Sequence, residues 1–296
     1  MGKVAIELKR ALAERALQGT PGGTTPRVLA SGTGWAVADV VCTAGPRDAS
    51  FEEQHDHYAI AIVLAGTFQY QSPMGRAVLT PGSVMLGNHG QCYECGHEHG
   101  EGDRCVSFWY APDFFERLAA DAGARGSSVD FDVPRLPPLR ALSSLVTAAG
   151  AGATASVDVP WEEFAVRLAT RAVTLAIGTS AATVSPPNAE ARVTRIVRAI
   201  ERQPGAALTI ENLAREARLS PYHFLRTFER LTGVTPHQFV LRTRLREAAL
   251  RLAEASGRVL DIALDCGFGD VSNFNHAFRA EFGVSPRAYR VRPARC

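Results

Sequence analysis

Cysteine and histidine side chains gather in one short stretch of the chain. Residues 92–105 read CYECGHEHGEGDRC, and an earlier histidine pair, His55 and His57, precedes them. Thiolates and imidazoles are the ligands that zinc and other thiophilic metals prefer. The stretch therefore predicts a site for zinc or another thiophilic divalent metal, although its spacing matches no standard zinc-finger pattern.

Two ligand sets are compatible with this stretch. In the first, His55 and His57 share one face of a strand, because side chains alternate along a strand, and Cys92 completes an open three-ligand site. In the second, four residues form a local site, namely Cys95, His97, His99 and Cys105. Two other interpretations stay open. One is a pair of thiols that senses oxidants or electrophiles, and the other is a loop of ordinary packed and solvated residues.

The remaining three cysteines, Cys42, Cys266 and Cys296, have no such neighbours in the sequence. We expect Cys266 to be a core residue of the C-terminal half.

A second group of polar side chains recurs in two similar segments fifty residues apart. Residues 220–239 read SPYHFLRTFERLTGVTPHQF, and residues 270–289 read DVSNFNHAFRAEFGVSPRAY. Each segment has an N-cap residue, phenylalanines at helical spacing, and a glycine followed three residues later by proline. A repeat at fixed period is one supersecondary unit used twice, and this unit has the pattern of a helix-turn-helix.

Each repeated segment should follow a short apolar helix. In the first unit Thr209 opens that helix, and its apolar residues are Ile210, Leu213, Ala214 and Ala217. In the second unit the corresponding residues are Leu260, Ile262, Ala263 and Cys266. The N-caps of the repeated helices are Ser220 and Asp270, and the left-handed C-caps are Gly233 and Gly283.

The faces that these helices turn away from their phenylalanines carry hydrogen-bonding and cationic groups. Such groups contact the base edges and phosphates of DNA. In a single helix, a polar face that only contacts solvent would look the same. Two such faces in two copies of one unit favour the interpretation that they bind DNA. The outward residues are Tyr222, Leu225, Arg226, Glu229 and Arg230, then Ser272, Asn273, Asn275, His276 and Arg279.

The two halves of the chain differ in charge. The 296 residues carry a formal net charge of +2, but residues 189–296 hold 18 arginines against 11 acidic residues, a balance of +7. Residues 1–188 hold 14 basic and 19 acidic residues, a balance of −5. This asymmetry indicates that only the C-terminal half meets a polyanion.

The sequence gives no sign of a membrane segment. No apolar run approaches the roughly 20 residues that a membrane span needs. The N-terminus, MGKVAIELKRALAERALQG, is charged and lacks the apolar core of a signal peptide. We therefore expect a cytoplasmic protein without membrane contact, in which the six cysteines form no structural disulfides.

The pattern of secondary structure changes along the chain. Strand-like alternation with frequent turn residues over 26–110 predicts an antiparallel sandwich or barrel. Helical patterns follow at 112–122, 137–150 and 160–177. Residues 179–189, TSAATVSPPNA, have the composition of a linker. Residues 237–256 predict a helix of ~25 Å, which could hold the two repeated helices near the ~34 Å spacing of successive major grooves.

The C-terminal residues carry a family resemblance. LTIENLAREARLSPYHFLRTFERLTGVTPHQFV, followed by IALDCGFGDVSNFNHAFRAEFGVSPRAYR, resembles the DNA-binding domain of AraC/XylS-type transcriptional regulators. The resemblance implies two helix-turn-helix subdomains, joined by a connecting helix, that bind an asymmetric site in adjacent major grooves. It implies base contacts by Tyr222, Leu225, Arg226, Ser272, Asn273, Asn275 and His276.

Three further positions follow from the same resemblance. Arg230 and Arg279 are better placed for phosphate contacts, and His223 lies nearer the packing side. Leu225 departs from the polar residue often found at its position. Its apolar side chain suits a thymine methyl group, or it leaves the first helix less selective.

The N-terminal half resembles the cupin-like sensor domain that many of these regulators carry. His55-Asp56-His57, followed by a strand and Gly66, resembles the first cupin motif, and Thr80-Pro81-Gly82-Ser83 resembles the start of the second. The glutamate that metal-binding cupins place after the histidine pair is absent, and residues 59–62 read AIAI instead. This departure disfavours an enzymatic cupin metal site.

These observations predict an α+β multidomain protein. Its N-terminal part is an antiparallel cupin-like β-barrel with helices, and its C-terminal part is an all-α domain of two helix-turn-helix units. The expected boundaries are 1–135 for the sensor domain, 136–178 for a helical dimerisation or docking segment, 179–189 for the linker and 190–296 for the DNA-binding domain.

We interpret the chain as a sequence-specific DNA-binding transcriptional regulator, not an enzyme, whose N-terminal domain senses a small molecule or a metal. Its expected partners are double-stranded DNA and that effector, with RNA polymerase and a second copy of the chain as further candidates. Two alternatives are a constitutive regulator with a dimerisation-only N-terminal domain and a cupin-type metalloenzyme fused to a DNA-binding domain.

Overall fold

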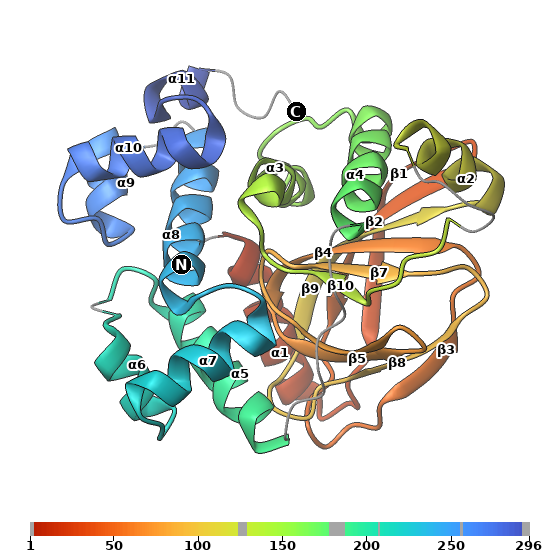
Figure 1. The fold of residues 1–296 in the computed structure, drawn as a ribbon, viewed down its shortest axis with the longest axis horizontal. Coiled ribbons are helices and arrows are strands. Elements are labelled where there is room, and N and C mark those ends of the chain that lie inside the picture. The colour runs from red at the N-terminus through yellow and green to blue at the C-terminus, as the bar shows by residue number, and fades with distance from the viewer. Residues whose placement is uncertain (1–2, 124–128, 178–186, 207, 255–256, 292–296) are drawn as a thin grey trace.

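A β-sandwich with covering helices and a helical C-terminal domain lie side by side (Figure 1). The structure is a computed structural model that describes residues 3–123, 129–177, 187–206, 208–254 and 257–291. The predicted fold class, an antiparallel cupin-like domain followed by an all-α domain, is confirmed.

Two antiparallel sheets form the sandwich in the described part of the chain. The larger sheet has the strand order β1 (Thr24–Gly32), β2 (Trp35–Cys42), β9 (Asp103–Tyr110), β4 (Tyr58–Gly66), β7 (Val84–Gly87) and β10 (Arg135–Leu136). The smaller sheet has the order β3 (Phe51–Gln54), β8 (Cys92–Gly96), β5 (Phe68–Ser72) and β6 (Gly75–Leu79).

Side-chain alternation divides the large sheet into two different faces. In β4, Tyr58, Ile60 and Ile62 belong to the core under the helices, whereas Ala59 and Ala61 face the second sheet. The same alternation runs through β9, where Val106, Phe108 and Tyr110 belong to the core under the helices, whereas Cys105, Ser107 and Trp109 face the second sheet. Small inward side chains leave space between the sheets.

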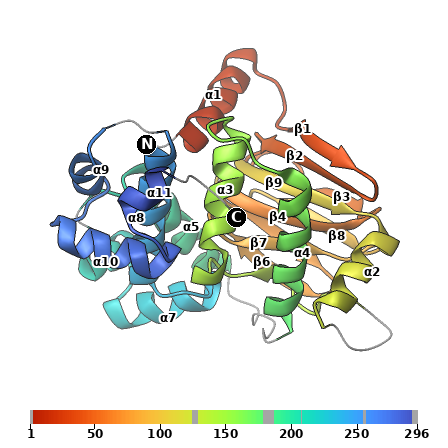
Figure 2. The ribbon, with the colours of Figure 1, turned by 90° about the horizontal axis from the view of Figure 1, so that it is seen from above.

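Helices cover the outer face of the large sheet, and Figure 2 shows α3 and α4 lying across it. The helices of this half are α1 (Lys3–Gln18), α2 (Pro112–Asp121), the 3₁₀ turn η1 (Arg140–Leu142), α3 (Ser143–Ala153) and α4 (Trp161–Ala176). The helix predicted from residue 137 begins later because Pro137 and Pro138 disfavour helical geometry in the residue before each proline. The apolar face of α4 is ordinary core of this domain.

The C-terminal domain consists of two helical units that share one long helix. Its helices are α5 (Pro187–Arg202), α6 (Ile210–Glu216), α7 (Pro221–Thr232), α8 (Pro236–Ala253), α9 (Val259–Asp265), α10 (Val271–Phe282) and α11 (Pro286–Val291). Within α8, Phe239 packs in the core of the first unit, and Leu245 and Leu252 pack in the core of the second. Residues 187–189 of the predicted linker are helical, and 179–186 lie outside the described residues.

The repeated helices begin and end as the sequence predicts. Ser220 accepts a hydrogen bond from the backbone of His223, and Asp270 accepts one from the backbone of Asn273. Gly233 and Gly283 end α7 and α10 with φ values of 77° and 78°. Glycine adopts this left-handed conformation without the steric cost that a Cβ atom imposes.

The short helices α6 and α9 differ in how much they bury. In α6, Leu213 and Ala214 are buried beside the first pair of phenylalanines, as expected. In α9, Ile262 is buried, whereas Leu260 is 48% exposed. Cys266 is buried in the second core, which confirms that expectation.

Arginine side chains join the two domains. Arg135 of β10 is buried and donates to the carbonyl oxygens of Leu231 at 2.8 Å and Thr232 at 3.0 Å, at the end of α7. Arg242 of α8 donates to the carbonyl of Pro138 at 2.9 Å. Helix α3 also packs against α8.

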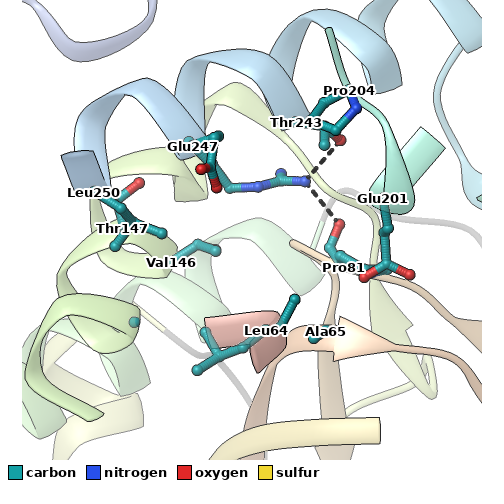
Figure 3. A pocket seen from close by; sticks show the side chains of 13 residues that line it. Leu64, Ala65, Pro81, Val146, Thr147, Glu201, Pro204, Thr243, Glu247 and Leu250 are labelled. Carbon is teal, nitrogen blue, oxygen red and sulfur yellow. Dashed lines mark hydrogen bonds between the residues drawn. The ribbon is translucent and has the colours of Figure 1, made fainter. Parts of the chain in front are cut away.

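A small cavity of about 80 Å³ lies where the domains meet (Figure 3). Arg246 crosses its wall and donates to the carbonyl of Pro81 at 3.1 Å and to Thr243 Oγ1 at 3.2 Å. On another side, Glu201 of α5 accepts a hydrogen bond from the backbone of Gly66 at 3.1 Å. Charged side chains thus supply a large part of the interface.

Among the residues that the structure describes, no helix combines the length and the apolar character that crossing a membrane requires.

Candidate nucleic-acid interface and sensor cavity

The outer face of α7 is open to solvent. Tyr222 is 62% exposed and Leu225 is 37% exposed, and Arg226 and Arg230 are exposed beside them. Arg226 donates to the Tyr222 hydroxyl at 3.0 Å, and its guanidinium carbon lies 5.7 Å from the centre of the Tyr222 ring. This pairing holds two of the predicted base-contacting side chains in one arrangement before DNA arrives.

The outer face of α10 is equally open. The five predicted contact residues of this helix are all exposed, and they are Ser272, Asn273, Asn275, His276 and Arg279. Behind them Phe274 and Phe278 are fully buried. The two repeated helices therefore both expose a polar face, and in both a pair of buried phenylalanines packs the opposite face into the core.

His223 differs from its predicted placement near the packing side. Its side chain is exposed, and its Nδ1 atom lies 2.9 Å from Ser220 Oγ, the N-cap of α7. His223 is the third residue of the helix, and the phenylalanine beside it takes the inward direction. Its observed contact is therefore with the helix cap and not with the core.

A cavity of about 230 Å³ lies between the two sheets. Its wall combines small residues and a tryptophan of the large sheet with aromatic and polar residues of the small sheet and its loops. Among them are Ala59, Ala61, Phe68, Tyr93, Ser107 and Trp109. A mostly apolar hollow with a few convergent polar groups is the usual form of a small-molecule site.

The first predicted ligand set is not assembled. His55 lines the cavity, where its Nε2 atom lies 3.0 Å from the Tyr70 hydroxyl and its ring stacks on Tyr93 at 3.9 Å. Burial lowers the pKa of His55 to about 4, so the ring is neutral at pH 7. His57 and Cys92 are exposed. The predicted shared strand face is wrong because residues 55–57 form the loop between β3 and β4.

The second predicted set is assembled only in part. Strand β8 ends at Gly96, so side-chain alternation along a strand does not place His97 and His99 on the same face as Cys95. Cys95, His97 and Cys105 line the same cavity. His99 does not line it, and its Nε2 atom lies 3.7 Å from a Glu98 carboxylate oxygen.

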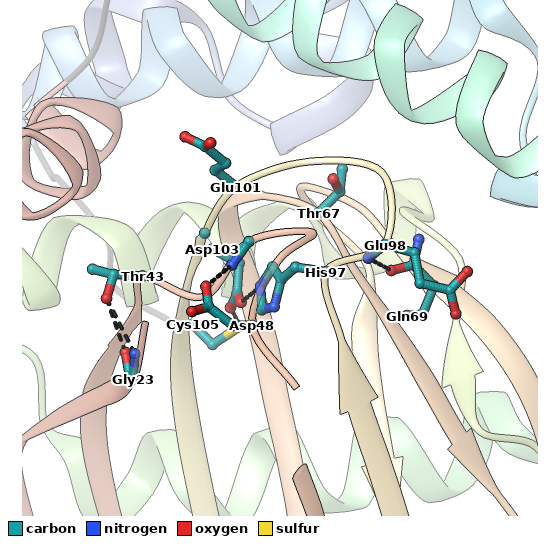
Figure 4. A network of polar contacts seen from close by, with 12 residues as sticks. Gly23, Thr43, Asp48, Thr67, Gln69, His97, Glu98, Glu101, Asp103 and Cys105 are labelled. Atoms are coloured by element: carbon teal, nitrogen blue, oxygen red, sulfur yellow. Dashed lines mark hydrogen bonds and ion pairs between the residues drawn. The ribbon is translucent and has the colours of Figure 1, made fainter. Parts of the chain in front are cut away.

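Two residues near His97, Cys42 and Asp103, were not among its predicted partners. Cys42 at the end of β2 lies directly opposite Asp103 at the start of β9 in the strand register. Asp103 Oδ1 lies 2.8 Å from His97 Nε2 (Figure 4). Burial, together with the charge of Asp103, raises the pKa of Cys42 to about 12. The expectation that Cys42 stands alone is therefore wrong.

Comparison with known proteins accounts for both halves of the chain. The profile of the AraC-like ligand binding domain matches residues 40–165, and that of a helix-turn-helix domain matches residues 213–292. The chain belongs to the AraC family of transcriptional regulators.

Curated relatives in the AraC family differ in how much they share with this chain. The HTH-type transcriptional activator RhaS of Klebsiella pneumoniae (strain 342) is 28% identical over 264 residues, which are 83% of this chain and 89% of the relative. The HTH-type transcriptional regulator Rv1931c of Mycobacterium tuberculosis is 38% identical over 86 residues, 29% of this chain and 33% of the relative.

Among solved structures, the DNA-binding domain of AdpA in complex with a target DNA is 30% identical. The match covers 34% of this chain and 90% of the AdpA domain, with a TM-score of 0.33.

Membership of the AraC family assigns a role to each half of the molecule. The protein is a DNA-binding transcriptional regulator with an N-terminal ligand-binding domain, and the curated relatives named above are regulators of transcription. The helices α7 and α10 lie within the matched helix-turn-helix region, and the sandwich cavity lies within the sensor half.

Proposed function

We propose that this regulator reads an asymmetric DNA site with α7 and α10 in consecutive major grooves, under the control of an effector bound in the sandwich cavity. The observation that carries the proposal is the pair of exposed polar faces on two helices with the same caps and the same buried phenylalanines.

The length of α8 supports the two-groove arrangement. Its 18 residues span about 27 Å at 1.5 Å per residue. Because the cores of both units include residues of α8, this helix fixes one unit relative to the other. Successive major grooves on one face of DNA are ~34 Å apart, so a strut of this length suits neighbouring grooves.

We divide the contacts by chemistry. Side chains near the start of each helix are assigned to bases, and these are Tyr222, Leu225, Arg226, Ser272, Asn273, Asn275 and His276. Arg230 and Arg279, nearer the helix ends, are assigned to phosphates.

Four other expectations stay predictions. They are the domain boundaries at residues 135, 178 and 189, contact with RNA polymerase, dimerisation and a cytoplasmic location.

The effector assignment follows from the cavity between the sheets. Aromatic rings and a neutral imidazole at His55 offer stacking and hydrogen bonds to a small polar molecule. The cavity also reaches thiol and imidazole groups that suit a metal ion. Either occupant would act on DNA binding through the arginine contacts that join the domains.

Replacing Arg226 by alanine tests the base assignment. We expect the binding free energy for the specific site to weaken by about 1–3 kcal/mol, with relaxed preference at one base pair. Arg226→Lys should recover little of that loss, because lysine keeps the charge but lacks the planar fork that reads guanine. Binding measured on a panel of single-base variants of the site gives the result.

An equal loss on every DNA sequence would contradict the base assignment and place Arg226 among the phosphate contacts. Arg167→Ala, an exposed arginine of α4 in the sensor half, is the charge-matched control and should leave the binding unchanged.

Replacing Arg279 by alanine tests the phosphate assignment. The logarithm of the binding constant should fall less steeply with the logarithm of salt concentration, by about one unit of slope, because one fewer counterion is released. Titrations at several salt concentrations give the slope. An unchanged slope would remove Arg279 from the phosphate contacts.

A further inference from the structure

Donor side chains of three kinds meet at the rim of the sandwich cavity, where three segments come together. Cys42 ends β2, Asp103 begins β9 opposite Cys42, and His97 follows β8 of the other sheet. Cys42 Sγ, one ring nitrogen of His97 and one carboxylate oxygen of Asp103 all lie within 4.8 Å of one another. All three residues are buried.

The ring of His97 is buried, and only one of its two nitrogens has a partner among the described residues. The residue is only 5% exposed, and its Nε2 atom lies 2.8 Å from Asp103 Oδ1. Its Nδ1 atom is buried and has no hydrogen-bond partner among the described residues. A polar atom left in this state costs free energy. An ion shared with Asp103 would bind the other nitrogen, Nε2, in place of the proton that now lies between Nε2 and Asp103 Oδ1.

A second thiol lies next to the group, in contact with Asp103. Cys105 Sγ lies 3.1 Å from Asp103 Oδ2 and is buried. Two sulfur atoms, one imidazole and one carboxylate are a donor set that zinc accepts in four-coordinate sites. The sulfur donors favour thiophilic ions over Mg²⁺ and Ca²⁺, which prefer oxygen ligands.

We propose that Cys42, His97, Asp103 and Cys105 bind one thiophilic divalent metal ion, with Zn²⁺ as the best match. On binding, each thiol releases its proton to solvent and ligates the metal as a thiolate. The ion would also tie the two sheets together, because His97 follows a strand of the small sheet whereas the other three ligands belong to the large one.

Another acidic and histidine group, Glu98, His99 and Glu190, is not a comparable site. Arg76 already binds both carboxylates, at 2.9 Å to Glu98 and 3.0 Å to Glu190. A guanidinium thus supplies the positive charge there.

The position of the metal site connects it to the DNA-binding domain. The turn that follows His97 ends at Gly102, and Arg198 of α5 donates to the carbonyls of Glu101 at 2.8 Å and Gly102 at 3.1 Å. Metal binding at His97 and Asp103 would fix both ends of this turn. Control of DNA binding by the ion, through Arg198, rests on the proposed function. Binding of the metal itself does not depend on that function.

Metal binding is tested on the full-length protein after removal of metal by a chelator, with a non-thiol reductant present. Calorimetric titration with Zn²⁺ should show one equivalent bound. Titration with Co²⁺ should show the charge-transfer absorption of thiolate ligation. No binding of Zn²⁺, or a Co²⁺ complex without that absorption, would overturn the site.

Three serine variants locate the ligands. Cys42→Ser and Cys105→Ser should each weaken Zn²⁺ binding more than about tenfold, since the loss of even an outer-shell partner costs 10–100-fold. Cys92→Ser is the matched control, because Cys92 is exposed on β8 and should leave the affinity unchanged. Loss of affinity in Cys92→Ser with full affinity in Cys42→Ser would overturn the proposal in favour of a site at His55 and His57.

A separate experiment tests whether the metal ion controls DNA binding. DNA affinity is first measured without metal, which tests the proposed function by itself. Zn²⁺ should then change that affinity by about fivefold or more in the wild-type protein. Arg198→Ala should bind Zn²⁺ equally well but lose the change. Full metal binding with unaltered DNA affinity in the wild-type protein would overturn the regulatory role.

Discussion

Replacing Phe278 by alanine is expected to destabilise the second helix-turn-helix unit by about 3–5 kcal/mol. The Phe278 side chain is fully buried, and its ring centre lies 4.6 Å from that of Phe282, 5.4 Å from that of Tyr289 and 5.5 Å from that of Phe274. Truncation removes these contacts and leaves a cavity. Because α10 would lose its anchor, specific DNA binding should disappear.

The effect should be confined to one part of the molecule. The core around Phe278 contains residues of α8 to α11 and none of the sandwich. Denaturant unfolding followed by circular dichroism should therefore show an early transition of the second unit, with the sandwich still folded. Leu264→Ala is the control, because Leu264 is 50% exposed in the same unit, and it should change the stability by no more than about 0.5 kcal/mol.

A single cooperative transition that shifts by less than 1 kcal/mol, with full DNA binding, would contradict the anchoring role of Phe278. It would also weaken the view that each unit needs its own phenylalanine core to present a reading helix.

Replacing Asp39 by alanine should destabilise the sensor domain by about 3–5 kcal/mol, because it removes one partner of a buried ion pair. Asp39 is 3% exposed, and Arg104 is fully buried. Two hydrogen bonds of 2.8 Å join Arg104 Nε and Nη2 to the two carboxylate oxygens of Asp39. Without Asp39, the guanidinium keeps the carboxylate of Glu7 at 2.5 Å but loses its bidentate partner.

Thermal or urea unfolding of the full chain measures this loss. Arg27→Ala serves as the control, because Arg27 also binds Asp39, at 2.7 Å, but its side chain is 56% exposed. Solvent screening limits the contribution of such a pair to about 1 kcal/mol. If Asp39→Ala costs no more than Arg27→Ala, the buried pair does not stabilise the pairing of β2 with β9.

The sequence predicts the C-terminal domain well because the signals there are local. An N-cap residue, a glycine C-cap and phenylalanines at helical spacing all lie within one helix length, and Ser220, Gly233 and Phe224 behave as their types require. Apolar residue type alone does not show which residues of a short helix are buried: α9 has seven residues, and Leu260 is half exposed although Ile262 is buried.

The sensor cavity is harder to predict because strand pairing brings together residues that are distant in the chain. Cys42 and Asp103 are neighbours only through the pairing of β2 with β9. Periodicity along a single strand shows which face a residue takes but not which strand lies beside it. His57 shows the related difficulty, since alternation applies only while the chain remains extended, and residues 55–57 turn.

The guanidinium of Arg135 has a consequence for how the halves of this regulator communicate. The last carbonyl groups of any helix lack partners within the helix, and at the end of α7 two of them find their donor on an edge strand of the sensor sheet. The first reading helix is thus completed by the other domain. Withdrawal of the sensor would leave these carbonyls to water and loosen the final turn. Binding at the two sites is then reciprocal. If an effector changes the affinity for the operator by some factor, the operator changes the affinity for the effector by the same factor.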